Sequence, residues 1–190
     1  MCSRYFLELK MLMELEEKIG YNFGLDLLSA KDFYPSDQIP FFIIKDKQLV
    51  AKLGTWGYRV LENKLIINAR QETLFEKKLF KEDVLNHRCI IPASGFYEWD
   101  QHKHRFTFKN DNQKLMFMAG LYRNNGNNQE VTIVTTNASG VMEGIHSRMP
   151  LIFNQKQMQQ WLNNENIDSL LKTNYQHLKI TAGVLQTSLF

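Results

Sequence analysis

Cysteine and proline are scarce in this sequence, which has two cysteines and four prolines among 190 residues. The two cysteines, Cys2 and Cys89, lie far apart, and no Cys/His spacing typical of a metal site occurs. These absences exclude a disulfide-stapled scaffold and a zinc-finger type of fold. We therefore expect the protein to need neither a metal nor a cofactor.

Long apolar runs are also missing. No stretch approaches the ~20 apolar residues that a membrane-spanning helix needs. Glu14, Glu16 and Glu17 stand where a signal peptide would need an apolar core. The chain has no repeat, no low-complexity tract and no long linker. We therefore expect a cytoplasmic protein that folds as one domain over residues 1–190 and has no membrane partner.

Aromatic residues, in contrast, are plentiful: Phe, Tyr and Trp make up 12% of the chain, and 44% of it is hydrophobic. A disordered chain lacks such residues, and 190 residues are enough to enclose a proper core. The formal net charge of +3 permits a polyanionic partner but does not demand one. Positive charge must be gathered in one place to attract such a partner.

Residue patterns predict both helices and strands in the first half of the chain. Helical spacing of apolar residues predicts helices over residues 7–19 and 71–87, and residues 20–37 are predicted to be mostly irregular. Two apolar runs around a polar turn predict a β-hairpin over residues 40–54. Residues 64–70 have the composition of a short strand.

Strands dominate the second half of the chain. Its β-branched and aromatic residues predict four strands, over residues 88–100, 104–110, 114–122 and 130–138. Asn154 is predicted to cap a helix that runs through Met158 and Trp161, and the last 25 residues fit no single class. Short strands with peripheral helices predict the α+β class, with a curved, barrel-like and mostly antiparallel sheet.

Four segments place polar or ionisable residues inside otherwise strand-like stretches: MCSR, IINAR, SGFYEW and GIHSRMP. In the first, Cys2 directly follows the initiator methionine. Removal of Met1 would leave a residue that carries both a free α-amine and a thiol, a pair that no internal cysteine offers. An ordinary small residue in a first strand is the alternative.

Two of these segments repeat the same spacing. Asn68 and Arg70 lie two residues apart and share a face of an extended chain, where Arg70 could grip a phosphate. His146 and Arg148 have the same spacing, and a histidine can move protons near neutral pH. The alternatives are a strand end for the first pair and a structural histidine for the second.

Glu98 stands between two aromatic residues, Tyr97 and Trp99. Burial beside apolar rings would raise the pKa of its carboxyl group and make it an acid available near neutral pH. A solvent-facing glutamate is the alternative. Strict alternation puts Tyr97 and Trp99 on the opposite face from Glu98, so one pocket could use all three only at a bulge or a strand end.

Taken together and in this order, MCSR, INAR, GFYEW and HSRMP resemble the SRAP family (SOS response-associated peptidase) from Met1 to about Trp161. The resemblance implies crosslinking to abasic sites in single-stranded DNA, and thus a protein associated with the nucleoid when bound. Ser3 stands where the family usually has glycine, and the family's later motifs are not recognisable in the tail. This departure leaves the C-terminal part of the DNA channel unassigned.

The resemblance also implies a role for each matching residue. Cys2 would be the nucleophile, and Asn68 would hold the amine and the opened sugar. Glu98 would shuttle protons, and His146 would assist ring opening. The residues implied to contact DNA are Arg4, Pro35, Trp56, Arg70, Trp99 and Arg148.

The groups of an N-terminal Cys2 predict the reaction. Its amine would form an imine with the aldehyde of the abasic sugar, and its thiol would add to the same carbon to close a thiazolidine. Two other functions stay open: a thiol-type peptidase that uses Cys2, chiefly on itself, and a non-catalytic module that binds single-stranded DNA. We expect a monomer in which Cys89 is a buried core residue.

Overall fold

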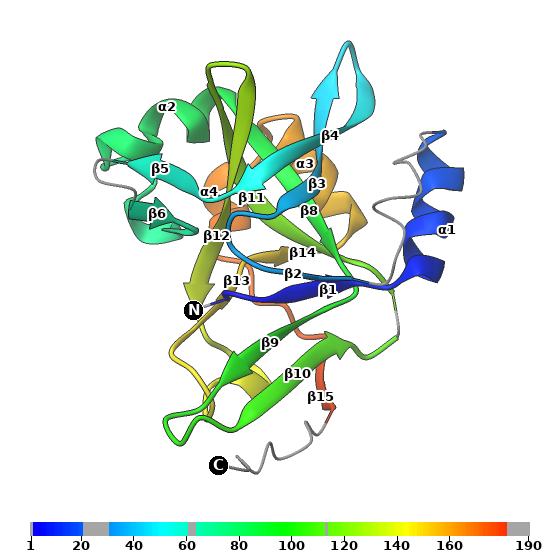
Figure 1. Cartoon of the computed structure of the whole chain (residues 1–190), viewed down its shortest axis with the longest axis vertical. Coiled ribbons are helices and arrows are strands. Elements are labelled where there is room, and N and C mark those ends of the chain that lie inside the picture. Colours follow the sequence, from blue (N-terminus) through cyan, green and yellow to red (C-terminus); the bar gives the residue numbers. More distant parts are fainter. Residues whose placement is uncertain (1, 21–30, 61–63, 113, 182–190) are drawn as a thin grey trace.

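The computed structural model of the chain describes residues 2–20, 31–60, 64–112 and 114–181, and Figure 1 shows it with its elements labelled. Within these residues, no helix is both long enough and apolar enough to cross a membrane. Strands make up most of the described elements, and they enclose a closed barrel with helices around it. The predicted α+β class and barrel-like core are therefore confirmed.

Five strands close the barrel. β12 (Asn128–Asn137) pairs in parallel with β4 (Gln48–Trp56) and antiparallel with β11 (Met116–Asn125). β3 (Gln38–Lys45) and β8 (Arg88–Ala93) complete the ring in the order β12-β4-β3-β8-β11, through antiparallel pairings. Because side chains alternate along each strand, every second residue points inward, and apolar side chains fill the interior.

Short strands extend the barrel along the second half of β12. β7 (Asn68–Arg70) lies parallel to β12, with Arg70 opposite Thr135. β13 (Arg148–Pro150) pairs antiparallel with β12, with Arg148 opposite Asn137. The end of β12 therefore lies between the strand that carries Asn68 and the strand that follows His146. Two further features lie next to the barrel: β14 (Ile152–Phe153), which pairs with β11, and the two-stranded ribbon of β5 (Tyr58–Val60) and β6 (Lys64–Ile66).

A second sheet occupies the lower half of the view in Figure 1. Its five antiparallel strands are, in order, β15 (Leu178–Thr181), β10 (Arg105–Asn110), β9 (Gly95–Trp99), β1 (Tyr5–Leu7) and β2 (Lys31–Phe33). The chain passes from β8 of the barrel to β9 of this sheet through the single residue Ser94. This short connection fixes β9, and with it Glu98, close to the barrel.

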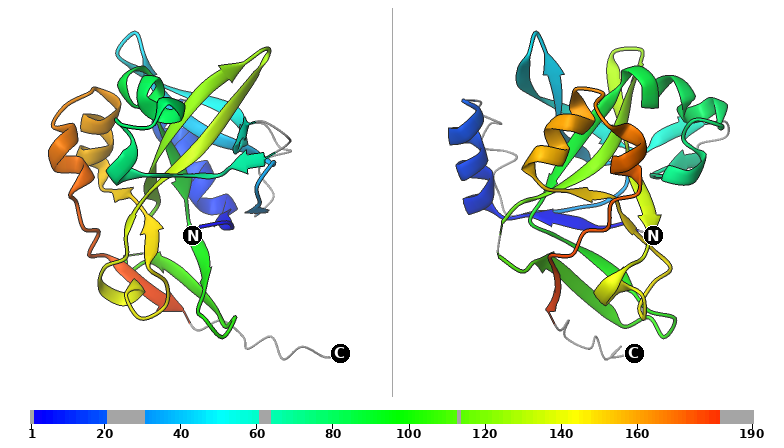
Figure 2. Two further views of the ribbon diagram at one scale, coloured as in Figure 1. Left: turned by 90° about the vertical axis from the view of Figure 1, so that its left-hand side faces the viewer. Right: turned by 180° about the vertical axis from the view of Figure 1, so that it is seen from behind.

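Helices lie around the two sheets. The described helices are α1 (Leu9–Ile19), α2 (Lys78–Asn86), α3 (Gln155–Leu162) and α4 (Ile167–Leu171), with short 3₁₀ turns η3 (Gln71–Thr73) and η4 (Gly140–Met142). Figure 2 shows α3 and α4 next to each other and well away from α1. None of these helices carries a predicted site residue, so the site is built from strands and the segments between them.

Two local predictions are confirmed in detail. The hairpin over residues 40–54 is formed by β3 and β4, and its two turn residues, Asp46 and Lys47, have φ values of 50° and 63°. Positive φ at both positions is typical of the two-residue turns that match strand twist. At the start of α3, Asn154 Oδ1 accepts a hydrogen bond from the Gln157 N–H at 2.9 Å.

Several element boundaries differ from the predictions. Leu7 ends β1, so the first helix begins at Leu9. Residues 71–87 open with η3, and α2 begins only at Lys78. The predicted strand over residues 88–100 divides at Ser94, where the chain changes sheet.

The prediction of a mostly irregular segment over residues 20–37 is wrong at one strand, and the last 25 residues had no single prediction. Lys31–Phe33 form β2 inside the segment predicted to be mostly irregular, while residues 21–30 lie outside the described residues. Of the last 25 residues, α4 and β15 are described up to Thr181, and residues 182–190 lie outside the described part.

Candidate active site at the N-terminal strand

The first residues of the chain lie against β9. Tyr5 pairs with Phe96, and the Tyr97 N–H donates a hydrogen bond to the Arg4 carbonyl at 3.0 Å. Gly95 permits this close approach, because a Cβ atom there would lie 2.3 Å from the Phe6 ring. The segment that precedes Tyr5 is thereby directed along the end of β9 that carries Glu98.

Cys2 is fully buried, with 0% of its surface exposed. Burial raises the pKa of its thiol well above the ordinary value, and the charge of Glu98 raises it further. The thiol is therefore protonated near neutral pH in this structure. Because the charge of Glu98 contributes to the raised pKa of the thiol, its carboxyl group lies within electrostatic reach of the sulfur.

Asn68 is tied directly to Cys2. Its Nδ2 donates a hydrogen bond to the Cys2 carbonyl at 2.9 Å. Its Oδ1 is buried and has no hydrogen-bond partner among the residues that the structure describes. The parallel pairing of β7 with β12 holds Asn68 at this place, opposite Ile133. The amide of Asn68 therefore holds the backbone of Cys2 through its nitrogen, and its oxygen can accept a further hydrogen bond.

Glu98 points into the protein. It is 3% exposed, whereas its neighbours Tyr97 and Trp99 are only half-buried. β9 is regular here, with Glu98 opposite Phe106 on β10. The solvent-facing alternative is therefore wrong, and no bulge brings the two aromatic rings to the face of Glu98. Cys2, Asn68 and Glu98 form one group, while Trp99 belongs to the other face of the sheet.

His146 lies between η4 and β13, in the segment that leads into Arg148. The Arg148 N–H donates to His146 Nδ1 at 2.9 Å, and the Arg148 carbonyl lies 3.1 Å from the same nitrogen. The imidazole can accept at Nδ1 when neutral and donate there when protonated.

Arg148, which is predicted to bind a phosphate, is bound by protein oxygens in this structure. Its side chain is buried, and each terminal nitrogen of its guanidinium group already donates to protein oxygens. Glu72 binds both nitrogens, at 2.7 and 3.0 Å. A phosphate could bind this guanidinium group only by displacing the carboxylate of Glu72, so the contact of Arg148 with DNA stays a prediction.

Trp56 contradicts its predicted role. Its indole ring is fully buried at the end of β4, and its Nε1–H donates to the Ile67 carbonyl at 3.0 Å. The ring packs edge-on against Tyr5, with 5.4 Å between centroids. A ring in this position cannot stack on a base, and it serves the core instead. Cys89 is fully buried as well, as predicted.

Arg4 lies on the outer face of the second sheet. Its guanidinium group lies over the Tyr97 ring at 4.7 Å and over the Tyr34 ring at 5.0 Å. Its Nε donates to Asp32 Oδ2 at 2.9 Å, and the Tyr97 hydroxyl donates to the other oxygen of Asp32 at 3.2 Å. Arg105 lies on Tyr97 at 5.3 Å. We call Arg4, Asp32, Tyr34, Tyr97 and Arg105 the arginine–tyrosine surface.

Sequence reasoning missed most of the arginine–tyrosine surface. Strand alternation opposite Glu98 could have identified Tyr97, but no local pattern pointed to Tyr34 or Asp32. Pro35 follows Tyr34 in a tight turn, in which Ser36 has a φ of 77°. Pro35 is therefore next to this surface, while Arg70 is exposed at the end of β7.

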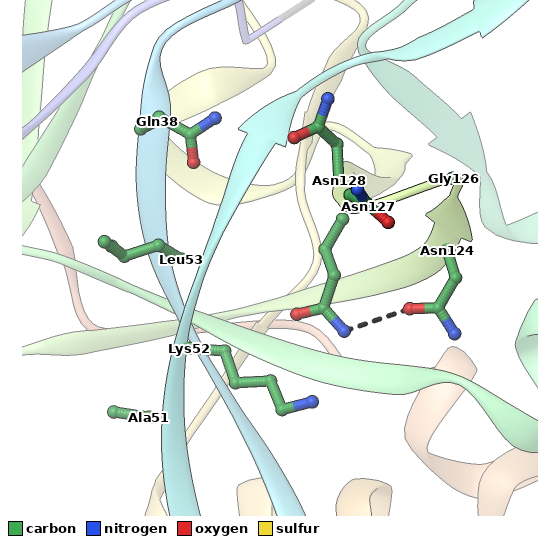
Figure 3. Close-up of a pocket in the computed structure, with 9 residues that line it drawn as sticks. Gln38, Ala51, Lys52, Leu53, Asn124, Gly126, Asn127 and Asn128 are labelled. Carbon is green, nitrogen blue, oxygen red and sulfur yellow. Dashed lines mark hydrogen bonds between the residues drawn. The ribbon is translucent and has the colours of Figure 1, made fainter.

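One cavity lies away from this group of residues. It has a volume of about 460 Å³ and lies between the β3–β4 strands and the β11–β12 hairpin. Amide side chains dominate its lining, as Figure 3 shows. Among them, Gln129 Nε2 donates to Asn124 Oδ1 at 3.1 Å. No predicted site residue lines it. Within the described residues, no group of three His, Cys, Asp or Glu side chains is arranged to hold a metal ion.

Comparison with known proteins finds relatives for this arrangement. The sequence model of the family described as SOS response associated peptidase (SRAP) matches residues 1–185. Abasic site processing protein YoqW of Bacillus subtilis (strain 168) is 41% identical over 112 residues, which cover 54% of this chain and 50% of that protein. Abasic site processing protein YedK of Escherichia coli (strain K12) is 27% identical over 141 residues, which cover 69% of this chain and 63% of that protein. The matched region thus spans about half of YoqW and somewhat more of YedK.

Solved structures share the fold. A protein from Bacteroides thetaiotaomicron superposes with a TM-score of 0.79 at 22% identity, covering 94% of this chain and 90% of that chain. A protein from Bordetella bronchiseptica gives a TM-score of 0.79 at 24% identity, covering 97% of this chain and 100% of that chain. At these identities the likeness extends to the fold alone.

Proposed function

Because the chain belongs to the SRAP family, whose model matches residues 1–185, we propose that it crosslinks itself to abasic sites in single-stranded DNA. Cys2 would form the bond after removal of Met1. The names of YoqW and YedK as abasic site processing proteins support the substrate. The observation that carries the proposal is the hydrogen bond of 2.9 Å from the Asn68 amide to the Cys2 carbonyl, beside the buried carboxyl of Glu98.

The reaction needs no external oxidant or reductant. The α-amine attacks the aldehyde carbon of the open sugar to give a carbinolamine, which loses water to form an imine. The thiol then adds to the same carbon, and its proton passes to the nitrogen. The ring that results contains the nitrogen, Cα, Cβ, the sulfur and the sugar carbon. One water molecule is released in all.

Asn68 is suited to hold the amine. Its Nδ2 fixes the carbonyl of Cys2, and its buried Oδ1 can accept a hydrogen bond from the amine that removal of Met1 would release. Such positioning keeps the nucleophile near its target and removes part of the entropic cost of the reaction. The Oδ1 of Asn68 would then have the α-amine of Cys2 as its hydrogen-bond partner.

Glu98 is suited to move the protons. The neutral thiol must lose its proton when it adds to the imine, and the positive charge of a protonated imine would favour the thiolate. A carboxylate within electrostatic reach of the sulfur can accept that proton and can also assist the loss of water. His146 would protonate the ring oxygen of the sugar, with its Nδ1 held by the backbone of Arg148.

The arginine–tyrosine surface supports binding of a single strand. This surface is close to the site, because Arg4 is only two residues from Cys2 along the chain. Tyr34 is 45% exposed and can stack on a base, as can the half-buried Trp99. Arg70 and Arg105 add positive charge for phosphates. Stacking and charge together favour binding with little sequence preference.

The test is a crosslinking assay with the purified chain. A single-stranded oligonucleotide that contains one uracil is treated with a uracil glycosylase and incubated with the protein. We expect a band of lower mobility on a denaturing gel, and an intact mass that equals the protein without Met1 plus the oligonucleotide minus one water. Absence of an adduct with a protein that has lost Met1 would refute the proposal.

A thiol peptidase is the second candidate, because the family description itself names a peptidase. The raised pKa of the Cys2 thiol disfavours it, since a thiol peptidase needs a ready thiolate. Cleavage of an unrelated peptide in the absence of DNA would favour this candidate.

A further inference from the structure

An ion pair joins the two sides of the proposed site, between the buried guanidinium group of Arg148 and the carboxylate of Glu72, whose side chain is 42% exposed. Arg148 lies on β13, two residues after His146, while Glu72 lies in η3, four residues after Asn68. The end of β12 runs between them and contributes Thr135 and Asn137. We call Glu72, Thr135, Asn137 and Arg148 the brace.

The bonds of the brace are numerous and short. The Arg148 guanidinium group donates to both oxygens of Glu72, at 2.7 and 3.0 Å, in a two-pronged arrangement. It also donates to Asn137 Oδ1 at 2.7 Å and to the Thr135 carbonyl at 2.7 Å. A planar guanidinium fork held at four acceptors leaves little freedom to the backbone that carries it.

The charges of the brace persist around neutral pH. Burial alone would raise the pKa of the Glu72 carboxyl, but the hydrogen bonds and charge of Arg148 outweigh burial and lower it. A depressed pKa means that the pair is intact at neutral pH and is lost only as the pH falls through the lowered value. Under working conditions the brace is therefore present as a full ion pair.

The brace acts on His146 through the backbone. The same Arg148 whose side chain is held by Glu72 donates its main-chain N–H to His146 Nδ1 at 2.9 Å. On the other side, Glu72 follows β7, the strand that places Asn68 against Cys2. A shift of the ion pair would therefore change the distance between the histidine and the Cys2–Asn68 pair.

We infer that Glu72 is a positioning residue, which acts through Arg148 to hold His146 in register with Cys2 and Asn68. This inference rests on the proposed crosslinking function. Its alternative is that Arg148 is a phosphate ligand that Glu72 keeps occupied until DNA arrives. The two ideas predict opposite effects of removing the carboxylate.

The test uses Glu72→Gln in single-turnover crosslinking over a range of DNA concentrations. We expect the maximal rate constant to fall roughly ten- to hundredfold, as displacement of a reacting group by about 1 Å can do. The DNA concentration at half-saturation and the final amount of adduct should stay unchanged. A variant that is only destabilised would form less adduct in total but would keep the maximal rate constant. Thermal unfolding curves measure its stability separately.

Two further variants complete the design. Glu72→Gln placed in an Arg148→Lys background should cost less than it does alone, because both changes break the same link. Glu8→Gln removes the partner of Lys109 in an ion pair on the other sheet and serves as the matched control, which should crosslink like the wild type.

The same assay distinguishes failure of the crosslinking function from failure of the role of Glu72. If the wild-type protein forms no adduct, the proposed function fails. If the wild type reacts but Glu72→Gln reacts at the same rate, the positioning role is wrong. A lower half-saturation concentration for Glu72→Gln would instead make Arg148 a phosphate ligand and overturn the brace.

Discussion

The barrel and the N-terminal end of the second sheet each bury a cysteine, and the two surroundings differ. Cys89 on β8 lies among Ile90, Ile91 and the close-packed Gly120, and burial raises the pKa of its thiol. Cys2 is just as buried, and its thiol pKa is raised too. Each cysteine has a side-chain donor on its carbonyl and a carboxylate whose charge raises its pKa: Asn68 and Glu98 at Cys2, and Trp161 and Asp83 at Cys89. The surroundings differ because Asn68 also has a buried Oδ1 that accepts no hydrogen bond from the described residues, close to the place where removal of Met1 would release an amine.

This difference shows that burial and a raised pKa do not by themselves indicate a reactive thiol. Cys89 also has a buried carboxylate within electrostatic reach, but an internal cysteine has no α-amine with which to close a ring. A buried acceptor without a partner has a cost, so the Oδ1 of Asn68 calls for a reason that packing does not give. Substitution of the same residue type in both regions can test this difference.

The cysteine pair should give the largest contrast. Cys2→Ala should abolish the crosslink entirely, because the thiol is lost and an imine alone does not survive denaturation and washing. Cys89→Ala should leave the yield of adduct unchanged. Both variants are measured by denaturing gel with the same abasic oligonucleotide. Adduct formation by Cys2→Ala at the wild-type level would show that another nucleophile does the work.

The tryptophan pair should separate stability from binding. Trp56→Ala should lower the free energy of unfolding by about 3–5 kcal/mol, because a large cavity opens in a closed core. Trp99→Ala should leave stability nearly unchanged and weaken binding of single-stranded DNA by about 1–3 kcal/mol, as loss of a stacked base does. Denaturant unfolding and fluorescence anisotropy give the two numbers. Similar unfolding losses in both variants would contradict the assignment of Trp99 to a binding face.

The same contrast explains what the sequence could predict. The hairpin over residues 40–54 and the capped start of α3 depend on neighbours a few residues away, so local patterns were sufficient. The burial of Trp56 depends on the parallel pairing of β4 with β12, which lies some 75 residues further along the chain. No local pattern reports such a pairing.

The site follows the same rule. Cys2, Asn68, Glu98 and His146 were identified from four motifs and their resemblance to a family, and the structure joins the first two by a direct hydrogen bond. The carboxylates that bind Arg4 and Arg148 were not identified. Asp32 lies in a segment predicted to be mostly irregular, and Glu72 was assigned to a helix that begins only at Lys78. Both pairs join residues distant in sequence, and only the fold reveals them.

The two carboxylate-bound arginines give the smallest expected effect and the finest distinction. The side chain of Arg4 is 23% exposed and that of Arg148 is 10% exposed, while their partners Asp32 and Glu72 are 26% and 42% exposed. A guanidinium group that solvent reaches can exchange its carboxylate for a phosphate. The less exposed guanidinium group of Arg148 is also bound to Asn137 and to the Thr135 carbonyl, so it resists exchange. Asp32→Asn should therefore strengthen binding of intact single-stranded DNA roughly two- to fivefold at low salt, and the gain should vanish at high salt.

Asp168→Asn on α4 removes the same charge from an exposed position away from this sheet and provides the control, measured by anisotropy titrations at several salt concentrations. Glu72→Gln in the same titrations should leave affinity unchanged. If both Asp32→Asn and Glu72→Gln tighten binding equally, exposure does not decide which arginine meets DNA. In that case the distinction between a surface that binds the strand and a brace that positions His146 would have to be abandoned, because both arginines would then act on phosphates alike.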